Sequence, residues 1–275
     1  MSMQKNVLFC YCSGPQNLDD SIAENIKEHL LSLATVSHGT EGVIVTLIED
    51  LCHWSAKEKD KLQSLGLSDN LTVVASCSQR AISSLLKYAG LELNDDAIDG
   101  FLNYRISSLE DIKSDIDTII AQSGGISAIN NITLDYKPAN MAWYPVLDYD
   151  LCTHCRQCEN FCLFGVYKNV QGKVVVNKPA KCKPYCPACA RICPNDAVIF
   201  PKHEKPEING SAFRQKESEN KPLANMQGNE LMSFLRGRSS IADKAAELDI
   251  PPELIKNLSP EQLKNIVKKK EQLEE

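Results

Sequence analysis

The sequence predicts an α/β domain with a parallel sheet at the N-terminus, then a small cysteine-rich α+β domain and a helical C-terminal tail. Unbroken runs of Val, Ile and Leu alternate with amphipathic stretches over residues 6–135. Eight cysteines crowd into residues 152–193, and a polar stretch separates them from a tail with helical patterning. The expected domains are residues 1–135, 140–203 and 226–275, with a polar linker over 204–225.

The α/β domain is predicted from two hydrophobic periodicities. Apolar residues that run without interruption indicate buried strands, and apolar residues that recur every three or four positions indicate helices. Strands are expected over residues 6–9, 43–48 and 71–75, and helices over 19–33, 55–65, 81–89 and 109–122. Gly90 and Gly124 are placed to end the last two helices. Apolar strands that alternate with helices favour a parallel sheet covered on both faces.

Composition excludes several classes of protein. The chain has 275 residues, of which 43% are hydrophobic, so it can bury a core, and its net charge of −6 disfavours DNA or acidic lipid as the main partner. No segment reaches the ~18 apolar residues of a membrane span. The first apolar run is too short for a secretory signal. We therefore expect a cytoplasmic protein, in which twelve cysteines indicate metal or redox chemistry rather than disulfides.

Eight of the cysteines form two runs of four. The first run has the spacing C-x2-C-x2-C-x3-C, and the second has C-x3-C-x2-C-x3-C-P. Three closely spaced thiolates supply three corners of a cubane cluster, and the fourth cysteine of each run binds the other cluster. Cluster I is expected to be held by Cys152, Cys155, Cys158 and Cys193. Cluster II is expected to be held by Cys182, Cys186, Cys189 and Cys162.

Other interpretations of these runs fit less well. Zinc takes four ligands, commonly from two C-x2-C pairs, so each run would have surplus thiols. Disulfides are rare in a cytosolic chain. The C-x3-C-x2-C spacing is also that of radical-SAM enzymes, but Ala188 stands where an aromatic residue is usual. The rest of the chain is also too short and polar for the barrel that those enzymes resemble.

Residues 146–203 resemble bacterial ferredoxins with two [4Fe–4S] clusters. The resemblance rests on the two cysteine runs and their order. The segment departs from the family in two places: Leu163 follows the first run where the family often has Pro, and one extra residue separates Cys182 from Cys186. The resemblance implies a domain that carries single electrons.

The remaining four cysteines follow the three predicted strands. They are Cys10, Cys12, Cys52 and Cys77. Since the carboxyl ends of parallel strands lie along one edge of a sheet, these thiols should converge there. Four thiolates suit a cubane cluster or a zinc ion. The alternative is that they are ordinary buried thiols.

Four short motifs accompany these cysteines. They are Cys-x-Cys at 10–12, a lone Cys at 52, Ala-x-Cys-Ser-x-Arg at 75–80 and Asn-x-Arg at 103–105. With these motifs in this order, residues 6–105 resemble the N-terminal domain of the flavin-binding subunit of heterodisulfide reductase, although Ser13 and Gln79 depart from the family pattern. The resemblance implies that the four cysteines hold a third [4Fe–4S] cluster and that Arg80 tunes its charge. The Gly-rich fingerprint for flavin is absent from the sequence, so a flavin would belong to a partner.

The tail has its own start signal. Ser259 and Gln262 are spaced as a capping box that opens a helix. We expect the tail to be a docking arm that folds against a partner protein, with a small helical bundle as an alternative. A DNA-binding helix-turn-helix fits less well, because DNA readers are usually basic.

The sequence as a whole predicts an iron–sulfur protein that relays single electrons through up to three [4Fe–4S] clusters to or from an oxidoreductase partner, one that could contain flavin. Its cysteines are ligands, so we expect no catalytic residue and no enzyme activity of the chain on its own. Two alternatives stay open. One is a redox or iron sensor whose output is the C-terminal helices, and the other is part of a disulfide-reducing enzyme.

Overall fold

The structure, a computed structural model, describes most of the first 214 residues. The described ranges are 5–12, 20–36, 42–67, 69–94, 96–133 and 142–214. The chain divides into two compact units, Met1–Gln215 and Lys216–Glu275, and the second lies outside the described residues. The predicted tail over residues 226–275, and the predicted linker beyond residue 214, lie outside them as well.

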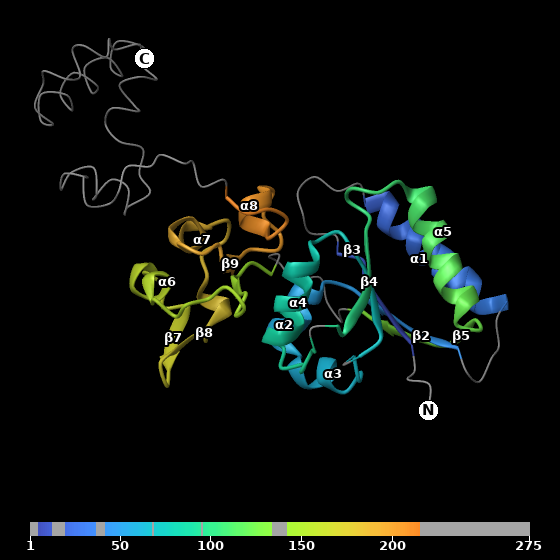
Figure 1. The fold of residues 1–275 in the computed structure, drawn as a ribbon, viewed down its shortest axis with the longest axis horizontal. Coiled ribbons are helices and arrows are strands. Elements are labelled where there is room, and N and C mark those ends of the chain that lie inside the picture. The colour runs from blue at the N-terminus through green and yellow to red at the C-terminus, as the bar shows by residue number, and fades with distance from the viewer. Residues whose placement is uncertain are drawn as a thin grey trace, which may run out of the picture. The chain divides into compact units, whose positions relative to one another are not determined.

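A parallel sheet of five strands forms the centre of the N-terminal part, in the order β4-β3-β1-β2-β5 (Figure 1). The strands are β1 (Asn6–Cys10), β2 (Val43–Ile48), β3 (Leu71–Ala75), β4 (Ile98–Asn103) and β5 (Ile126–Ile132). Asn6 pairs with Ile44 on one side and with Leu71 on the other, so the three central strands begin at the same level. The predicted parallel α/β arrangement is confirmed.

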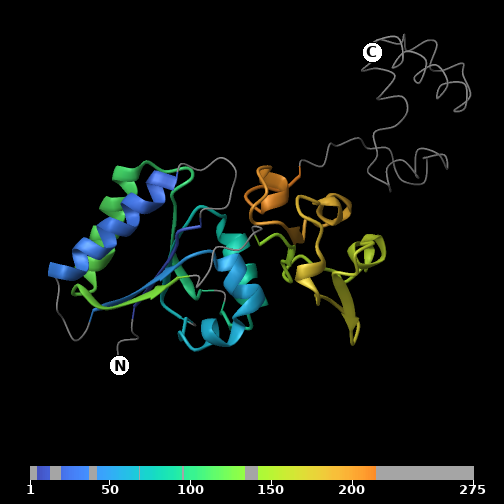
Figure 2. The same cartoon turned by 180° about the vertical axis from the view of Figure 1, so that it is seen from behind.

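Helices cover both faces of this sheet, as two opposite views show (Figure 1; Figure 2). The helices α1 (Asp20–Val36) and α5 (Leu109–Gln122) lie over one face, and α2 (Leu51–Lys57), α3 (Lys59–Gln63) and α4 (Gln79–Tyr88) lie over the other. Because side chains alternate along a strand, β1 contributes Phe9 to the core beneath α1 and α5, and Leu8 and Cys10 to the opposite core. The first cysteine therefore faces the side of α2 and α4.

The strands β4 and β5 were not predicted from the sequence. β4 contains Asp99 and Gly100, and β5 contains Asn130 and Asn131, so neither has the unbroken apolar run of a buried strand. Both are the outer strands of the sheet, where most of their residues keep contact with solvent. Their positions depend on pairing with β3 and β2, which local hydrophobicity does not reveal.

The single helix predicted over residues 55–65 was wrong. Two short helices lie there, and α2 already begins at Leu51, while Glu58 separates it from α3. Asp50 caps α2, because its Oδ1 atom accepts a hydrogen bond of 3.2 Å from the backbone N–H of His53. This early start places Cys52 in the first turn of α2.

The cysteine-rich segment, residues 142–214, has short strands and single-turn helices. The strands β6 (Val146–Leu147) and β9 (Val198–Ile199) pair antiparallel, as do β7 (Tyr167–Val170) and β8 (Lys173–Val176). The helices are α6 (Gln157–Phe161), the 3-10 helix η1 (Pro179–Lys181), α7 (Ala188–Ile192) and α8 (Pro206–Asn209). The third cysteine of each run lies in α6 or α7, and the fourth is the C-cap of the same helix. The two runs therefore share one local design.

The sheet and the cysteine-rich segment share a hydrophobic core. Tyr144, Val146 and Ile199 belong to the same buried cluster as Cys10 and Leu8 of β1. The first pairing of the cysteine-rich segment, β6 with β9, is therefore packed directly against the α2 and α4 side of the sheet. The two parts form one compact unit.

Residues 204–214, which the sequence analysis assigned to the polar linker, pack against the cysteine-rich segment. Ile208 of α8 is buried, and its carbonyl accepts a hydrogen bond from the N–H of Phe200 at 2.9 Å. The guanidinium of Arg214 donates to the carbonyls of Arg191 and Cys193. This stretch therefore wraps back on the second cysteine run. None of the helices in the described parts of the chain combines the length and apolarity needed to cross a bilayer.

Candidate metal centres

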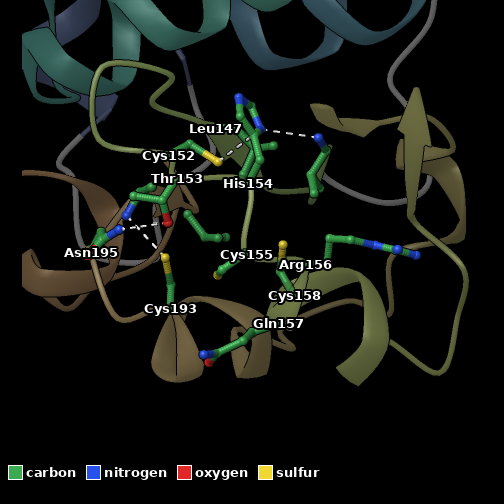
Figure 3. Close-up of a pocket in the computed structure, with 13 residues that line it drawn as sticks. Leu147, Cys152, Thr153, His154, Cys155, Arg156, Gln157, Cys158, Cys193 and Asn195 are labelled. Carbon is green, nitrogen blue, oxygen red and sulfur yellow. Dashed lines mark hydrogen bonds between the residues drawn. The ribbon is translucent and has the colours of Figure 1, made fainter. Parts of the chain in front are cut away.

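Four cysteines from both runs line one hollow in the cysteine-rich segment, as Figure 3 shows. They are Cys152, Cys155, Cys158 and Cys193, which we call set I. Burial raises the pKa of the Cys158 thiol to about 12, and the neighbouring Cys193 adds to the rise. Burial also raises the pKa of Cys152, and Cys193 contributes to that rise. The fourth cysteine of the second run thus lies with the first three cysteines of the first run.

The other four cysteines of the runs form set II: Cys182, Cys186, Cys189 and Cys162. Burial raises the pKa of Cys182 to about 12, with further contributions from Cys186 and then Cys162. Burial also raises the pKa of Cys189 to about 12, and Cys182 and Cys162 again contribute. The fourth cysteine of the first run therefore lies with the second run, as the predicted crossed arrangement requires.

The loops of the two cysteine runs contain residues in the left-handed backbone conformation. His154 and Arg156 in the first loop have φ values of 55° and 63°, and Tyr185 in the second has a φ of 60°. Such left-handed values are uncommon for residues other than glycine. They turn the backbone sharply between consecutive cysteines. Tyr185 lies within the longer Cys182–Cys186 spacing, so the extra residue is accommodated in a left-handed turn.

Hydrogen bonds reach the cysteine sulfurs from fixed donors. The phenol of Tyr167 donates to Cys189 Sγ at 3.0 Å, and the N–H of Ala197 donates to Cys193 Sγ at 3.3 Å. His154 Nδ1 lies 3.6 Å from Cys152 Sγ, but it accepts the N–H of Val174 at 3.2 Å. That nitrogen therefore has no proton to donate to the sulfur.

The remaining four cysteines come together at the carboxyl ends of β1, β2 and β3. Cys10, Cys12, Cys52 and Cys77 are all buried in one cluster, which we call the N-terminal set. Burial raises the pKa of Cys10 well above its usual value, and Cys12 and Cys77 raise it further. Burial does the same to Cys52, whose neighbours include Cys77 and Cys12. The convergence predicted from strand order is therefore present in the structure.

The backbone carbonyls of three of these cysteines are held by side chains from distant elements. Tyr104 donates from its hydroxyl to the carbonyl of Cys10 at 3.0 Å, and Tyr144 donates to that of Cys52 at 2.7 Å. Asn103 Nδ2 donates to the carbonyl of Cys77 at 3.2 Å. Neither tyrosine was assigned a role from the sequence, since only the fold shows where its hydroxyl ends.

Charged groups surround the N-terminal set although it is buried. Lys202, whose side chain is 2% exposed, places its Nζ 2.6 Å from Asp50 Oδ2. Burial alone would lower the pKa of Lys202, but Cys12, Cys52 and Asp50 hold it above its usual value. Burial raises the pKa of Cys77, and the nearby positive charge of Arg105 offsets part of that rise. Its Nε and Nη2 atoms are buried and have no hydrogen-bond partner among the described residues.

Arg80, to which the resemblance gave a role in tuning the charge at the N-terminal set, makes its side-chain contacts with the cysteine-rich segment. Its Nε donates to Asp148 Oδ2 at 2.6 Å, its Nη2 donates to the carbonyl of Asp196, and its guanidinium lies over the ring of Phe213. The charge of Arg80 is thus paired within the cysteine-rich segment. Arg105, the last residue of the Asn-x-Arg motif, is the arginine whose charge acts on Cys77 and lowers its pKa.

The donor set fits a cubane cluster better than a single ion. Within the described ranges, no three Cys, His, Asp or Glu side chains lie close enough together to hold one metal ion. A zinc ion binds its sulfurs at ~2.3 Å, which would bring the four almost into contact. A cubane binds four thiolates through four different irons and leaves them farther apart. Uncompensated thiolates are costly at such buried positions, and a positively charged metal core would offset that cost.

The chain is similar to known proteins over part of its length. No family model matches the sequence. The chain is 43% identical over 74 residues and 41% identical over 54 residues to two uncharacterized ferredoxins of Methanocaldococcus jannaschii. It is 39% identical over 54 residues to a ferredoxin of Methanothermococcus thermolithotrophicus. These matches cover 26%, 19% and 19% of the chain, and 50%, 86% and 88% of the relatives, so the chain spans only half of the first one.

Proposed function

Since the chain belongs to the ferredoxin family through about a fifth of its length, we propose that it relays single electrons through three [4Fe–4S] clusters to or from an oxidoreductase partner. Its relationship to ferredoxins supports an iron–sulfur electron-transfer role. The number of clusters and the partner are the proposal. The proposal is supported chiefly by the proximity of cysteines from separate segments: those of set I line one hollow, those of the N-terminal set share one buried cluster, and those of set II act on one another electrostatically.

Sets I and II are proposed to hold clusters I and II, and the N-terminal set a third cluster. When bound, each cluster would accept and release one electron at a time. The residues of the chain hold the sulfurs, keep water away and direct hydrogen bonds and charges toward them. Tyr167 at set II and Lys202 at the N-terminal set are examples of these two kinds of influence.

The proposed partner is a flavin-containing oxidoreductase. The resemblance of residues 6–105 to the flavin-binding subunit of heterodisulfide reductase supports this, together with the absence of a Gly-rich flavin fingerprint from the sequence. The chain would then supply the cluster-bearing part of such a system and leave the two-electron chemistry to its partner. Co-purification of a flavoprotein that reoxidises the reduced chain would support this assignment. A reduced chain that reacts only with other one-electron carriers would contradict it.

Cluster content tests the proposal directly. The protein should be purified without oxygen, and iron and acid-labile sulfide should be measured per chain. Three cubanes predict about twelve of each, and two predict about eight. The double variant Cys52→Ser/Cys77→Ser should lose about four irons, and Cys155→Ser/Cys158→Ser should lose a different four.

The outcomes separate the possible functions of the N-terminal set. About twelve irons in the wild type, with the losses above, would support three clusters. About eight irons in fully loaded protein, unchanged in Cys52→Ser/Cys77→Ser, would leave a two-cluster ferredoxin attached to a thiol-bearing domain. One zinc per chain that disappears in the same variant would make the N-terminal set a zinc site.

A further inference from the structure

A buried ion pair joins the cysteine-rich segment to the N-terminal set. Lys202 follows β9, and its Nζ reaches Asp50 Oδ2 at 2.6 Å across 152 positions of the chain. Both side chains are nearly inaccessible, with 2% and 11% of their surface exposed. The neighbouring carbonyl of Pro201 accepts a hydrogen bond from the Cys77 thiol at 3.7 Å. The cysteine-rich segment thus delivers a charged side chain to a site built on the other part of the chain.

The two charges interact with the cysteines and with each other. Lys202 lines the same small cavity as Cys52, and Asp50 directly precedes α2, in which Cys52 lies. Charges interact strongly in such a place, because the surrounding groups are apolar and little water screens them. Reduction adds one negative charge to a cluster, so a fixed positive charge favours the reduced form and a fixed negative charge opposes it.

We propose that Lys202 and Asp50 are an opposed pair of charges that sets the reduction potential of the N-terminal cluster. The inference rests on the proposed function, since it requires a cluster on Cys10, Cys12, Cys52 and Cys77. Lys202 raises the potential of this cluster and Asp50 lowers it. The ion pair between them holds both side chains in place close to Cys52. The potential of one cluster is therefore controlled by a residue from the segment that carries the other two.

The pair allows conservative variants. Lys202→Met removes the positive charge and keeps the length of the side chain, and Lys202→Arg keeps the charge. Asp50→Asn removes the negative charge and keeps a good N-cap, and Asn also tolerates the left-handed φ of 63° found at this position. The double variant Lys202→Met/Asp50→Asn removes both members of the pair, so neither charge is left without the other.

The experiment is an EPR-monitored potentiometric titration of the full-length protein, purified without oxygen and shown to carry about twelve irons. Lys202→Met should lower the potential of one cluster and Asp50→Asn should raise the potential of the same cluster. The double variant should return close to the wild type, and Lys202→Arg should leave the potential in place. The affected signal should be the one that Cys52→Ser/Cys77→Ser abolishes.

Several results would overturn the inference. Unchanged potentials in both single variants that retain their iron would refute it while leaving the three-cluster relay intact. A shift in the signals of clusters I or II would assign the pair to another site. If Lys202→Met loses iron, Asp50→Asn and the double variant still decide the matter. A wild type with about eight irons would remove the proposed third cluster, and the inference would fall with it.

A different observation bears on the order of the clusters. Cys182 of set II packs against the buried cluster that contains the N-terminal set and also against the core of its own segment. Trp143 lines the cavity beside Cys52, and its ring centroid lies 5.4 Å from that of Tyr185, inside the Cys182–Cys186 loop. Of set I, Cys158 and Cys193 belong to the core of the cysteine-rich segment, Cys152 packs against that core alone, and Cys155 is exposed.

We infer that cluster II is the immediate neighbour of the N-terminal cluster, so that electrons pass in the order cluster I, cluster II, N-terminal cluster, or the reverse. Magnetic coupling between reduced clusters falls steeply with distance. EPR of the fully reduced protein should therefore show splitting of the N-terminal signal that persists in Cys155→Ser/Cys158→Ser, which lacks cluster I. It should vanish in Cys182→Ser/Cys186→Ser, which lacks cluster II. The opposite dependence would overturn the order, as would an unsplit signal in the wild type.

Discussion

Tyr144 and Cys52 are joined by a hydrogen bond of 2.7 Å, in which the phenol donates to the backbone carbonyl across 92 positions of the chain. The tyrosine precedes β6 of the cysteine-rich segment, and the cysteine lies in α2 at the edge of the parallel sheet. Both residues are buried. Tyr144, Val146 and Ile199 of the cysteine-rich segment form a cover over the N-terminal set. The bond therefore joins this cover to Cys52, one of the proposed ligands.

Removal of the Tyr144 hydroxyl should destabilise the protein. Tyr144→Phe leaves the ring in place and the Cys52 carbonyl without this donor, which costs about 1–3 kcal/mol for a buried group. The free energy of unfolding should fall by that amount in anaerobic urea titrations. Tyr149→Phe is the matched control, because Tyr149 donates to the Val174 carbonyl over a longer 3.4 Å and is more exposed. Equal effects in both variants would contradict the role given to Tyr144.

The phenol of Tyr167 should tune cluster II. It donates to Cys189 Sγ at 3.0 Å, and hydrogen bonds to ligand sulfurs stabilise the reduced, more negative cluster. Tyr167→Phe should therefore lower the potential of cluster II in a potentiometric titration. Cluster I provides an internal control in the same sample. A potential that stays constant, with the iron content intact, would show that the bond does not form in the loaded protein.

The Arg80–Asp148 ion pair should contribute to stability and not to the potential of the N-terminal cluster. Arg80→Met leaves the buried carboxylate of Asp148 unpaired, so we expect a loss of the order of 3 kcal/mol in unfolding free energy. Lys87→Met on the same helix is the control. Its partner Asp150 is exposed, so the loss should be well below ~1 kcal/mol. A shift in the N-terminal potential in Arg80→Met would restore the role suggested by the sequence.

Arg105, unlike Arg80, should affect the potential of the N-terminal cluster. Its guanidinium is buried, two of its nitrogens have no hydrogen-bond partner among the described residues, and its charge favours the thiolate of Cys77. Arg105→Met should lower the potential of the N-terminal cluster and leave clusters I and II unchanged. Arg105→Lys, which keeps the charge, should restore part of the shift. A variant with all three potentials unaltered would exclude Arg105 as a tuning residue.

Thiol reactivity of the iron-free protein should follow burial. Burial raises the pKa of Cys10 and Cys52, so at pH 8 a smaller fraction of these thiols is ionised than in an unperturbed cysteine. Timed alkylation followed by mass spectrometry should label the exposed Cys155 first and the N-terminal set last. Raising the pH should speed the labelling of the N-terminal set. Uniform labelling at pH 8 would indicate that the set is accessible when iron is absent.

Much of the central sheet and of the cysteine grouping follows from local sequence. β2, β3 and α5 match their predicted bounds, because each has a clear hydrophobic period and defined ends. The convergence of Cys10 with Cys77 follows from strand order alone, since parallel strands end at one edge. The spacing of the two runs likewise predicts that Cys193 lies with the first run.

What the sequence did not reveal depends on contacts between distant segments. Asp50 and Lys202 become partners only when the residues after β9 meet the start of α2, and no local pattern marks either residue. Tyr144 is an ordinary aromatic residue until its hydroxyl meets the Cys52 carbonyl. The family resemblance that gave Arg80 a role does not reveal its ion pair with Asp148. Side-chain partners of this kind are set by tertiary packing, which periodicity and spacing do not report.

The cover of the N-terminal set is synthesised after the set itself. All four of its cysteines precede residue 78, whereas Tyr144, Ile199 and Lys202 leave the ribosome much later. The four proposed ligands are therefore made before the segment that covers them, and the sheet edge closes only when β6 and β9 can pair. Release of the proposed third cluster from the finished protein would then require that this later-made cover detach first. The lifetime of the N-terminal cluster should accordingly follow the opening rate of the cysteine-rich segment rather than the lability of its own iron–sulfur bonds.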